Sequence, residues 1–254
     1  MLETQDLTIR FGGHVAVNAV SCAFAPGTLT AIVGPNGAGK TTYFNLISGQ
    51  LKATAGTVSL DGQLLSGLSA SARTRAGLGR AFQLTNLFPN LTVLENVRLA
   101  VQATRDGAHR RGLNLWSIWS DHRALTERAD QILADVALKS KEDATVASLP
   151  HGDQRKLEVA LLMALEPKVF MFDEPTAGMN AAEAPVILDL IRKLKQDKSK
   201  TILLVEHKMD VVRELADRII VLHNGQLVAD GEPAEVIASP IVQEAYLGVT
   251  KEAA

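Results

Sequence analysis

The 254-residue sequence predicts an α/β fold in which a parallel-sheet core carries an antiparallel β subdomain and a helical subdomain. Predominantly apolar runs at 29–33, 168–172 and 201–205 predict buried strands that alternate with helical patterns, an order typical of a parallel sheet. Near the N-terminus, strands of alternating polarity separated by glycine-containing turns predict antiparallel pairing. From 91 to 165 the periodicity is helical, so we expect a helical addition to the core.

The individual elements follow from the same patterns. The expected strands are 7–11, 15–20, 29–33, 57–60, 78–82, 168–172, 201–205, 219–222 and 226–229, the last two joined by the hairpin dipeptide Asn224-Gly225. The expected helices are 42–48, 91 onward, 124–138, 151–165, 181–195, 233–238 and 241–247. The segment 105–120 interrupts the helical pattern and predicts an insertion. Its Trp116 and Trp119 either pack on the helical subdomain or form a docking surface for a partner or a membrane face.

Composition excludes several classes of protein. The formal net charge of −2 gives no bulk electrostatic attraction to nucleic acid. The single cysteine, Cys22, rules out an internal disulfide, suits a reducing compartment and is expected to be a small core residue. The sequence begins without a signal-peptide pattern and contains no run of about 18 apolar residues. We therefore expect a cytoplasmic protein that reaches a membrane only through a partner.

The segment 34–41 reads GPNGAGKT and fits the spacing G-x-x-x-x-G-K-[ST] between a strand and a helix, which predicts a phosphate-binding loop. Glycines let successive N–H groups turn toward one anion, and the helix start adds its positive dipole end. Lys40 is expected to reach the β- and γ-phosphates, and the Thr41 hydroxyl to ligate Mg²⁺. The nucleotide contacts expected here are Gly34, Asn36, Gly37, Ala38, Gly39, Lys40, Thr41 and Thr42. The alternative is a glycine-rich turn without chemical meaning.

A second nucleotide motif lies at 169–174, where an apolar strand ends on Asp173 and Glu174. Ligands of α/β sheets bind at the carboxyl ends of the strands, so both side chains are expected at the site. Asp173 suits the shell of Mg²⁺, and Glu174 suits polarisation of a water for attack on the γ-phosphate. The alternative is an ordinary solvent-facing sheet edge.

At this point the chain resembles a family. The segment 149–153, LPHGD, lies upstream of the Asp173 strand and looks like an altered form of the LSGGQ segment of ATP-binding-cassette (ABC) ATPases. Further landmarks of that family follow in the expected order: Phe11 for the aromatic that stacks on adenine, Gln83 for the Q-loop glutamine, 177–180 (AGMN) for the D-loop and His207 for the switch histidine. Alone, Phe11 would be a core strand residue, Gln83 a surface amide and His207 a loop or core residue. The resemblance covers essentially the whole chain.

The resemblance implies a P-loop NTPase core and one nucleotide-binding domain over 1–254, with a helical subdomain at about 84–165 and an insertion near 105–120. It implies ATP hydrolysis with ATP and Mg²⁺, catalysed by Lys40, Gln83, Glu174 and His207, with Mg²⁺ held by Thr41, Gln83 and Asp173. Two such domains would pair head to tail, so that His151, Gly152 and Asp153 contact the nucleotide of a second subunit. Gln83 would couple the site to a membrane permease.

The LPHGD segment departs from the family pattern. Pro150 replaces a serine, His151 replaces the first glycine and Asp153 replaces a glutamine. An aspartate at a helix start typically gains about 0.3–1 kcal/mol. One unit of negative charge at roughly 10 Å from the opposing nucleotide would cost about 1.7 kcal/mol at an effective dielectric of about 20. We therefore expect this segment to close the dimer less tightly than the family pattern would.

Several segments look like the ATPases of branched-chain amino-acid importers: 82–84 leading to 87–97, the insertion, the D-loop, 205–209 and 245–248. ATPases of urea or amide importers and of lipopolysaccharide export share much of this pattern and remain alternatives. The expected partners are a second nucleotide-binding subunit, permease subunits and, indirectly, a solute-binding protein, at the cytoplasmic face of the membrane.

Hypotheses from other classes are less well supported by the sequence. A family member that works in translation or DNA repair usually carries two cassettes or long coiled-coil insertions, which are absent here. A GTP-binding switch would need an N-K-x-D motif, and the sequence has none. A regulatory cassette without hydrolysis would fit the altered LPHGD segment but not the intact Lys40, Asp173, Glu174 and His207.

Overall fold

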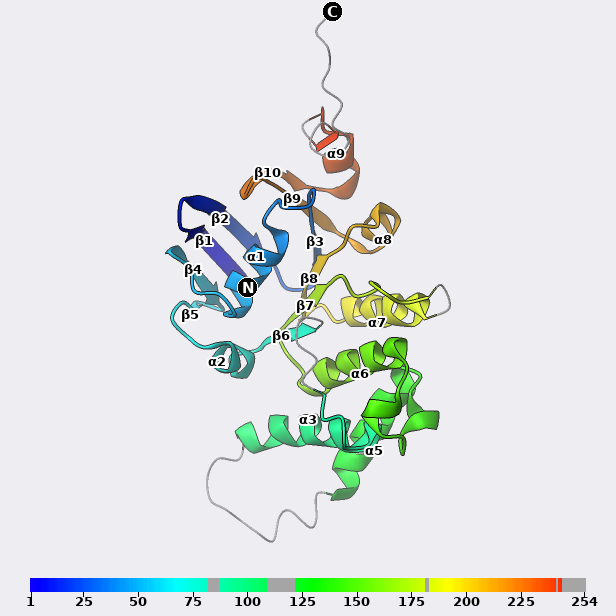
Figure 1. Ribbon diagram of the computed structural model, residues 1–254. Helices are drawn as coiled ribbons and strands as arrows, with labels where there is room; N and C mark the ends of the chain where they lie inside the picture. The colour runs from blue at the N-terminus through cyan, green and yellow to red at the C-terminus, as the bar shows by residue number, and fades with distance from the viewer. Residues whose placement is uncertain (82–86, 109–121, 181–182, 241, 244–254) are drawn as a thin grey trace, which may run out of the picture. The chain divides into compact units, whose positions relative to one another are not determined.

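The computed structural model describes the chain except for residues 82–86, 109–121, 181–182, 241 and 244–254. The chain divides into two compact units, which are described separately (Figure 1). The sheet unit comprises Met1–Leu78, Lys168–Glu174 and Lys195–Ala254. The helical unit comprises Gly79–Pro167 and Pro175–Leu194.

The six-stranded sheet has the order β10-β9-β3-β8-β7-β6, and the sheet unit contains all of its strands except most of β6. The strands are β3 (Leu29–Val33), β6 (Leu78–Ala81), β7 (Val169–Asp173), β8 (Thr201–Val205), β9 (Arg218–His223) and β10 (Gln226–Gly231). β3 pairs in parallel with β8 and with β9, and β7 pairs in parallel with β8. Every residue of β3, β7 and β8 is buried, as expected for strands covered on both faces. The predicted parallel core is confirmed.

A four-stranded antiparallel sheet with the order β2-β1-β4-β5 forms the other β layer of this unit. Its strands are β1 (Leu2–Phe11), β2 (His14–Phe24), β4 (Ala55–Leu60) and β5 (Gln63–Leu64). Residues of β2 alternate between buried and more exposed positions, because one face of the sheet packs on the core. The predicted antiparallel strands are therefore confirmed, and both neighbours of β1 run longer than the sequence pattern indicated.

The helices of the sheet unit are α1 (Lys40–Ser48), α2 (Ala70–Arg75), α8 (Met209–Leu215) and α9 (Pro233–Ala238). α1 begins two residues before the predicted start at 42, and its Tyr43, Phe44 and Ile47 are completely buried. Its C-terminus is capped by Arg73 of α2, whose Nη1 donates to the carbonyls of Leu46 and Ile47, each at 2.7 Å. A cation at a helix C-terminus stabilises the last carbonyl groups, so Arg73 stabilises the C-terminal end of α1.

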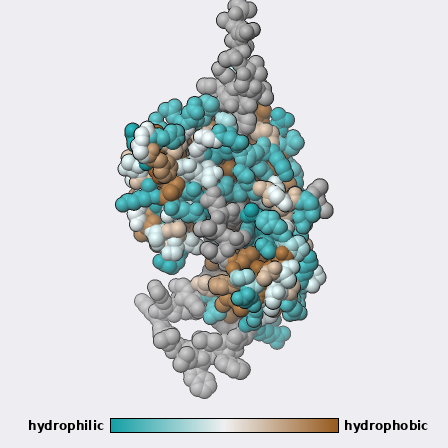
Figure 2. All heavy atoms as spheres, in the orientation of Figure 1, coloured by the Kyte–Doolittle hydropathy of each residue, from teal (hydrophilic) through white to brown (hydrophobic). Residues whose placement is uncertain are grey.

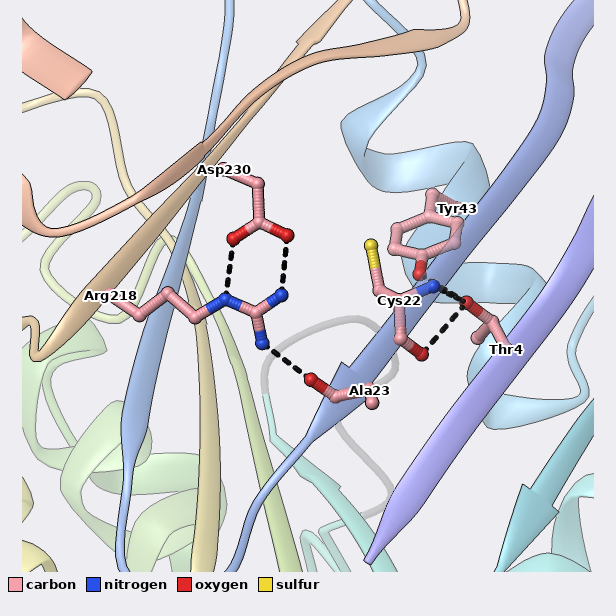
Figure 3. Close-up of polar contacts among 6 residues, drawn as sticks. All are labelled: Thr4, Cys22, Ala23, Tyr43, Arg218 and Asp230. Carbon is pink, nitrogen blue, oxygen red and sulfur yellow. Dashed lines mark hydrogen bonds and ion pairs between the residues drawn. The ribbon is translucent and has the colours of Figure 1, made fainter.

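Two groups of polar contacts connect the antiparallel sheet to its neighbours: a buried one reaches α1, and an exposed one reaches the six-stranded sheet (Figure 3). Thr4 Oγ1 lies 2.7 Å from the Tyr43 hydroxyl of α1 and accepts the Cys22 N–H at 3.0 Å. Arg218 of β9 donates to both carboxylate oxygens of Asp230 of β10, at 2.6 and 2.5 Å, and to a main-chain carbonyl of β2. Burial raises the pKa of the Cys22 thiol, which agrees with the expected core role of this free cysteine.

The helical unit contains α3 (Val93–Ala108), α5 (His122–Asp135), α6 (His151–Ala164) and most of α7 (Ala184–Gln196), with short 3-10 helices at Lys139–Lys141 (η1) and Val146–Ser148 (η2). α3, α5 and α6 contact one another and bury an apolar face each. α3 continues past the predicted break at 105, and the rest of the predicted insertion, with both tryptophans, lies outside the described residues. The predicted helical subdomain at 84–165 stays a prediction.

The surface carries few large apolar side chains where it is described. In Figure 2 hydrophilic residues cover most of the visible face of the sheet unit, and a hydrophobic patch appears on the helical unit. Phe11 in the sheet unit is 50% exposed, and Phe88 in the helical unit is 55% exposed. Among the residues that the structure describes, no helix has the length and apolar character needed to cross a bilayer.

Candidate functional site

The segment 34–41 forms a tight loop between buried β3 and the start of α1. Gly39 is the N-cap of α1 in the left-handed region, with φ of 98°, and provides no side-chain cap for the helix N–H groups. A side chain at Gly34 would place its Cβ 2.1 Å from the carbonyl oxygen of Leu222, and one at Gly39 would place it 2.5 Å from that of Ala16. Only glycine fits these two positions without displacing the neighbouring carbonyl groups.

The β9–β10 hairpin holds this loop from behind. The Gly225 N–H donates to the carbonyl of Ala38 at 3.0 Å, and the Asn18 N–H donates to the carbonyl of Gly225 at 2.8 Å. Ala38 is buried and donates its own N–H to the Pro35 carbonyl at 3.2 Å, whereas Asn36 and Gly37 are exposed at the tip. A ligand therefore meets the tip and the start of α1 before it meets Ala38.

Lys40 is buried, with 6% of its surface exposed, directly beneath this tip. Its ammonium group donates to the carbonyls of Gly34 at 2.6 Å and Pro35 at 2.9 Å. Burial lowers the pKa of Lys40, while Glu174 and Asp173 act in the opposite direction. A buried cation on two neutral carbonyls, next to the open N-terminus of α1, fits an anionic group such as a phosphate.

Asp173 is the last residue of β7, and Glu174 follows it in the same unit. Asp173 is buried, and Glu174 adopts a left-handed φ of 51° that few non-glycine residues take. The Glu174 N–H donates to the carbonyl of Val205 at 2.9 Å, which fixes the turn. Glu174 Oε1 then lies 2.7 Å from Nε2 of His207, and the main-chain N–H of His207 donates to Oε2 of Glu206 at 2.8 Å. The geometry thus joins two of the predicted catalytic residues in one hydrogen-bonded pair.

For the remaining predicted residues of the sheet unit, the structure gives the position and the exposure. Thr41 is exposed and Thr42 is half-buried, and both lie in the first turn of α1 directly after the loop. Phe11 ends β1 with its ring half exposed, which is a surface suited to stacking rather than a core position. Gln83 lies outside the described residues, so its predicted catalytic and metal roles stay predictions.

In the helical unit, the LPHGD segment forms the start of α6. Pro150 is the N-cap and makes no side-chain cap hydrogen bond, as expected from the missing hydroxyl. The imidazole of His151 lies beside Gly178 of the predicted D-loop, since a Cβ on Gly178 would be 3.8 Å from its Cδ2. The carboxylate of Glu183 lies against Gly152, since a Cβ on Gly152 would be 2.3 Å from its oxygens. An anion already lies next to the start of this helix.

Asp153 is almost completely buried and is bound by two lysines. Lys156 Nζ donates to Oδ1 at 2.9 Å, and Lys141 Nζ donates to Oδ2. Burial acts to raise the pKa of Asp153, but the bonds from Lys141 and Lys156 outweigh it and lower the pKa overall. Our sequence-based estimate treated Asp153 as an uncompensated charge facing a nucleotide, and that premise is wrong, because two ammonium groups neutralise the carboxylate within its own unit.

Sequence reasoning missed the partners of this segment. Lys156 was within reach of a helical-spacing argument, since it lies three residues after Asp153. Lys141 and Glu183 are brought to the segment by tertiary structure, and no local pattern marks them.

Two family models match the chain. The model described as ABC transporter matches residues 17–177, which include the phosphate loop and the Asp173–Glu174 pair. The model described as branched-chain amino acid ATP-binding cassette transporter matches residues 226–252.

Similar proteins cover almost the whole chain. The high-affinity branched-chain amino acid transport ATP-binding protein LivG of Escherichia coli K12 is 38% identical, over 98% of this chain and 98% of the relative. The corresponding protein BraF of Pseudomonas aeruginosa is 37% identical over the same shares. Among solved structures, the ADP conformation of MJ1267, an ATP-binding cassette of an ABC transporter, superposes with a TM-score of 0.80 at 30% identity, covering 98% of this chain and 99% of that one. A dimeric post-hydrolysis state of the cassette MJ0796 bound to ADP and Pi gives 0.77 at 26% identity, covering 92% and 99%.

Proposed function

Because this chain belongs to the ABC transporter family and is an ATPase of that family, we propose that it drives the import of branched-chain amino acids. The observation that carries the substrate class is the full-length similarity to LivG and BraF together with the C-terminal match at 226–252. It favours this substrate class over urea, amides or lipopolysaccharide.

The sheet unit binds the nucleotide in this proposal. The tip of the loop and the start of α1 hold the phosphates, Lys40 adds a buried positive charge, and Phe11 offers its exposed ring to the adenine. Thr41 and Asp173 supply the oxygen ligands that Mg²⁺ prefers, with Gln83 as the predicted third. When bound, Mg²⁺ neutralises charge that develops on the phosphates during hydrolysis.

The Glu174–His207 pair activates the water that attacks the γ-phosphate. The Glu174 carboxylate accepts a proton from the water as a general base. His207, with its proton on Nε2, donates to Glu174 Oε1 and keeps that carboxylate in one orientation. The left-handed backbone at Glu174 costs conformational energy, and such strain is typical of residues that a site must aim.

The second half of each ATP site comes from another nucleotide-binding subunit, either the same chain or a paralogue. His151, Gly152 and Asp153 at the start of α6 face that subunit's nucleotide in this arrangement. Permease subunits provide the membrane path, a solute-binding protein delivers the amino acid, and the chain works at the cytoplasmic face of the membrane. The net charge of −2 gives no reason to add nucleic acid as a partner.

The test is uptake by proteoliposomes that contain this chain, its permeases and its second nucleotide-binding subunit. We expect ATP-dependent uptake of labelled leucine, isoleucine and valine, and neither uptake nor hydrolysis with Glu174→Gln. Labelled urea serves as the competing substrate. Uptake of urea instead of leucine would overturn the substrate class, and a wild-type assembly without ATP hydrolysis would overturn the proposal as a whole.

A further inference from the structure

The first turn of α6 carries a buried ionic cluster in which Asp153 is bound by two lysines that have no role in the proposed mechanism. Asp153 is 4% exposed, and each of its carboxylate oxygens is bound by a different lysine. Lys156 lies one turn further along α6 and is itself 9% exposed. Lys141 comes from η1, and its side chain is 45% exposed.

These two lysines have different structural consequences. The bond from Lys156 stays within α6 and stabilises the helix locally. The bond from Lys141 ties the first turn of α6 to η1, a segment whose main chain is fixed by other bonds: the Lys141 N–H donates to Leu138 and its carbonyl accepts from Ala144.

That segment is in turn anchored to the start of α3. The Val93 N–H donates to the carbonyl of Ala144 at 3.0 Å, and the Leu94 N–H donates to that of Glu142 at 3.0 Å. Lys141 therefore connects the first turn of α6 to a rigid framework within the helical unit.

We propose that Lys141 is a positioning residue for the ATP site shared between two subunits, acting through Asp153 on the LPHGD segment. This rests on the proposed function, in which that segment meets the nucleotide of a second subunit. By holding the Asp153 carboxylate, Lys141 fixes the direction of the first N–H groups of α6. It also cancels the negative charge that the segment would otherwise present to phosphates.

The neighbouring Lys139 offers a matched control. It lies in the same 3-10 helix and also forms two ion pairs, with Asp130 at 2.7 Å and Glu142 at 2.5 Å. Neither partner belongs to the LPHGD segment, and Lys139 has no place in the proposed ATP site. Lys139→Met therefore removes another lysine with two ion pairs from the same 3-10 helix and leaves both bonds to Asp153 in place.

The experiment compares Lys141→Met with Lys139→Met in the assembled transporter and in the chain alone. For Lys141→Met we expect ATP turnover of the assembly to fall about 3- to 10-fold, while the Kd for ATP of the chain alone, set by the phosphate loop, stays within 2-fold of wild type (about 0.4 kcal/mol or less for that Kd). Lys139→Met should match the wild type in both measurements. Lys141→Arg should recover most of the turnover, because it keeps the charge.

A double variant tests whether the loss of turnover in Lys141→Met depends on the charge of Asp153. Lys141→Met with Asp153→Asn removes both charges, and its turnover should exceed that of Lys141→Met alone. Equal turnover for Lys141→Met and Lys139→Met would overturn the inference, as would a parallel loss of ATP affinity in the single chain. A wild-type assembly that hydrolyses no ATP would overturn the proposed function, and the inference with it.

Discussion

Two helix starts in this molecule have opposite designs. α1 begins after a glycine-rich loop, has an exposed tip at Asn36 and Gly37, and places a buried cation, Lys40, beneath it. α6 begins after Pro150, has a buried anion, Asp153, in its first turn, and already lies beside the carboxylate of Glu183. The start of α1 offers a buried cation to an incoming anion. At the start of α6, the negative charge of Asp153 is already balanced by Lys141 and Lys156 of the same unit. Nucleotide affinity should therefore depend on the α1 start, and the α6 start should adjust what happens after binding.

The largest effect should come from Glu174→Gln. Loss of a general base typically lowers turnover by about 10²–10⁴-fold, while ATP binding by the loop should persist. Steady-state hydrolysis and equilibrium ATP binding measure the two. Glu166→Gln is the matched control, because Glu166 is also a glutamate with positive φ, of 46°, but pairs with Arg128 in the helical unit. If Glu174→Gln kept the turnover of the wild type, Glu174 would not be the general base.

Lys40→Met tests the cation under the loop. We expect ATP affinity to fall about 10- to 150-fold, since a hydrogen bond to a charged group contributes about 1.5–3 kcal/mol. The lowered pKa of Lys40 shows that the folded chain disfavours this charge, so the nucleotide-free variant should keep its thermal stability. Lys195→Met is the control, as Lys195 also donates to a carbonyl, that of Leu215, at 2.8 Å. If ATP raised the melting temperature of Lys40→Met as much as that of the wild type, nucleotide affinity would not depend on the cation at the start of α1.

Alanine at one glycine of each helix start should act in opposite directions on folding. Gly37→Ala meets open space but must adopt φ of 81°, which costs about 1–2 kcal/mol for a residue with a Cβ. At Gly152 the three atoms nearest to an added Cβ belong to the carboxylate of Glu183, the end of a long side chain, and alanine gains helix propensity of up to about 1 kcal/mol. Denaturant unfolding of the nucleotide-free chain gives both values. A strongly destabilised Gly152→Ala would mean that Glu183 is fixed in place, and Glu183→Ala in that background would then restore stability.

The smallest effect should be a pH dependence at the α6 start. The pKa of Asp153 is lower in the folded chain than the unfolded value of about 3.9, so its stabilising contribution is complete above that pH and is lost as pH falls through the folded pKa. The free energy of unfolding of wild type should thus exceed that of Asp153→Asn at pH 7, and the difference should shrink at pH 3. A difference that is constant between the two pH values would show that the lysines do not hold the charged form.

The sequence was most informative where structure is local. The apolar runs at 29–33 and 201–205 coincide with β3 and β8, because strands buried on both faces need continuous apolar sequence. The strand–loop–helix context around Lys40 was predicted correctly, because the glycines of the loop determine the backbone conformation within a few residues. α2 (Ala70–Arg75) and α8 (Met209–Leu215) were not predicted, since they are short and show no full amphipathic period.

The parts of the site that escaped prediction depend on distant contacts. Lys141 reaches Asp153 across η2, and Glu183 reaches Gly152 from the segment before α7. The repulsion expected from Asp153 left out Lys141 and Lys156, because the partners that decide the sign of a local charge effect are supplied only by the fold. The looser dimer closure predicted from the sequence stays a prediction.

The hairpin bonds around Ala38 have a consequence for biosynthesis. The loop is shaped by Gly225, which donates to Ala38 and accepts from Asn18, and β3 is flanked by β8 and β9 from the C-terminal part of the chain. During translation the loop sequence leaves the ribosome early, but β8, β9 and Gly225 are made only near the end of the chain. We therefore expect a nascent chain to gain affinity for ATP only after the β9–β10 hairpin has emerged.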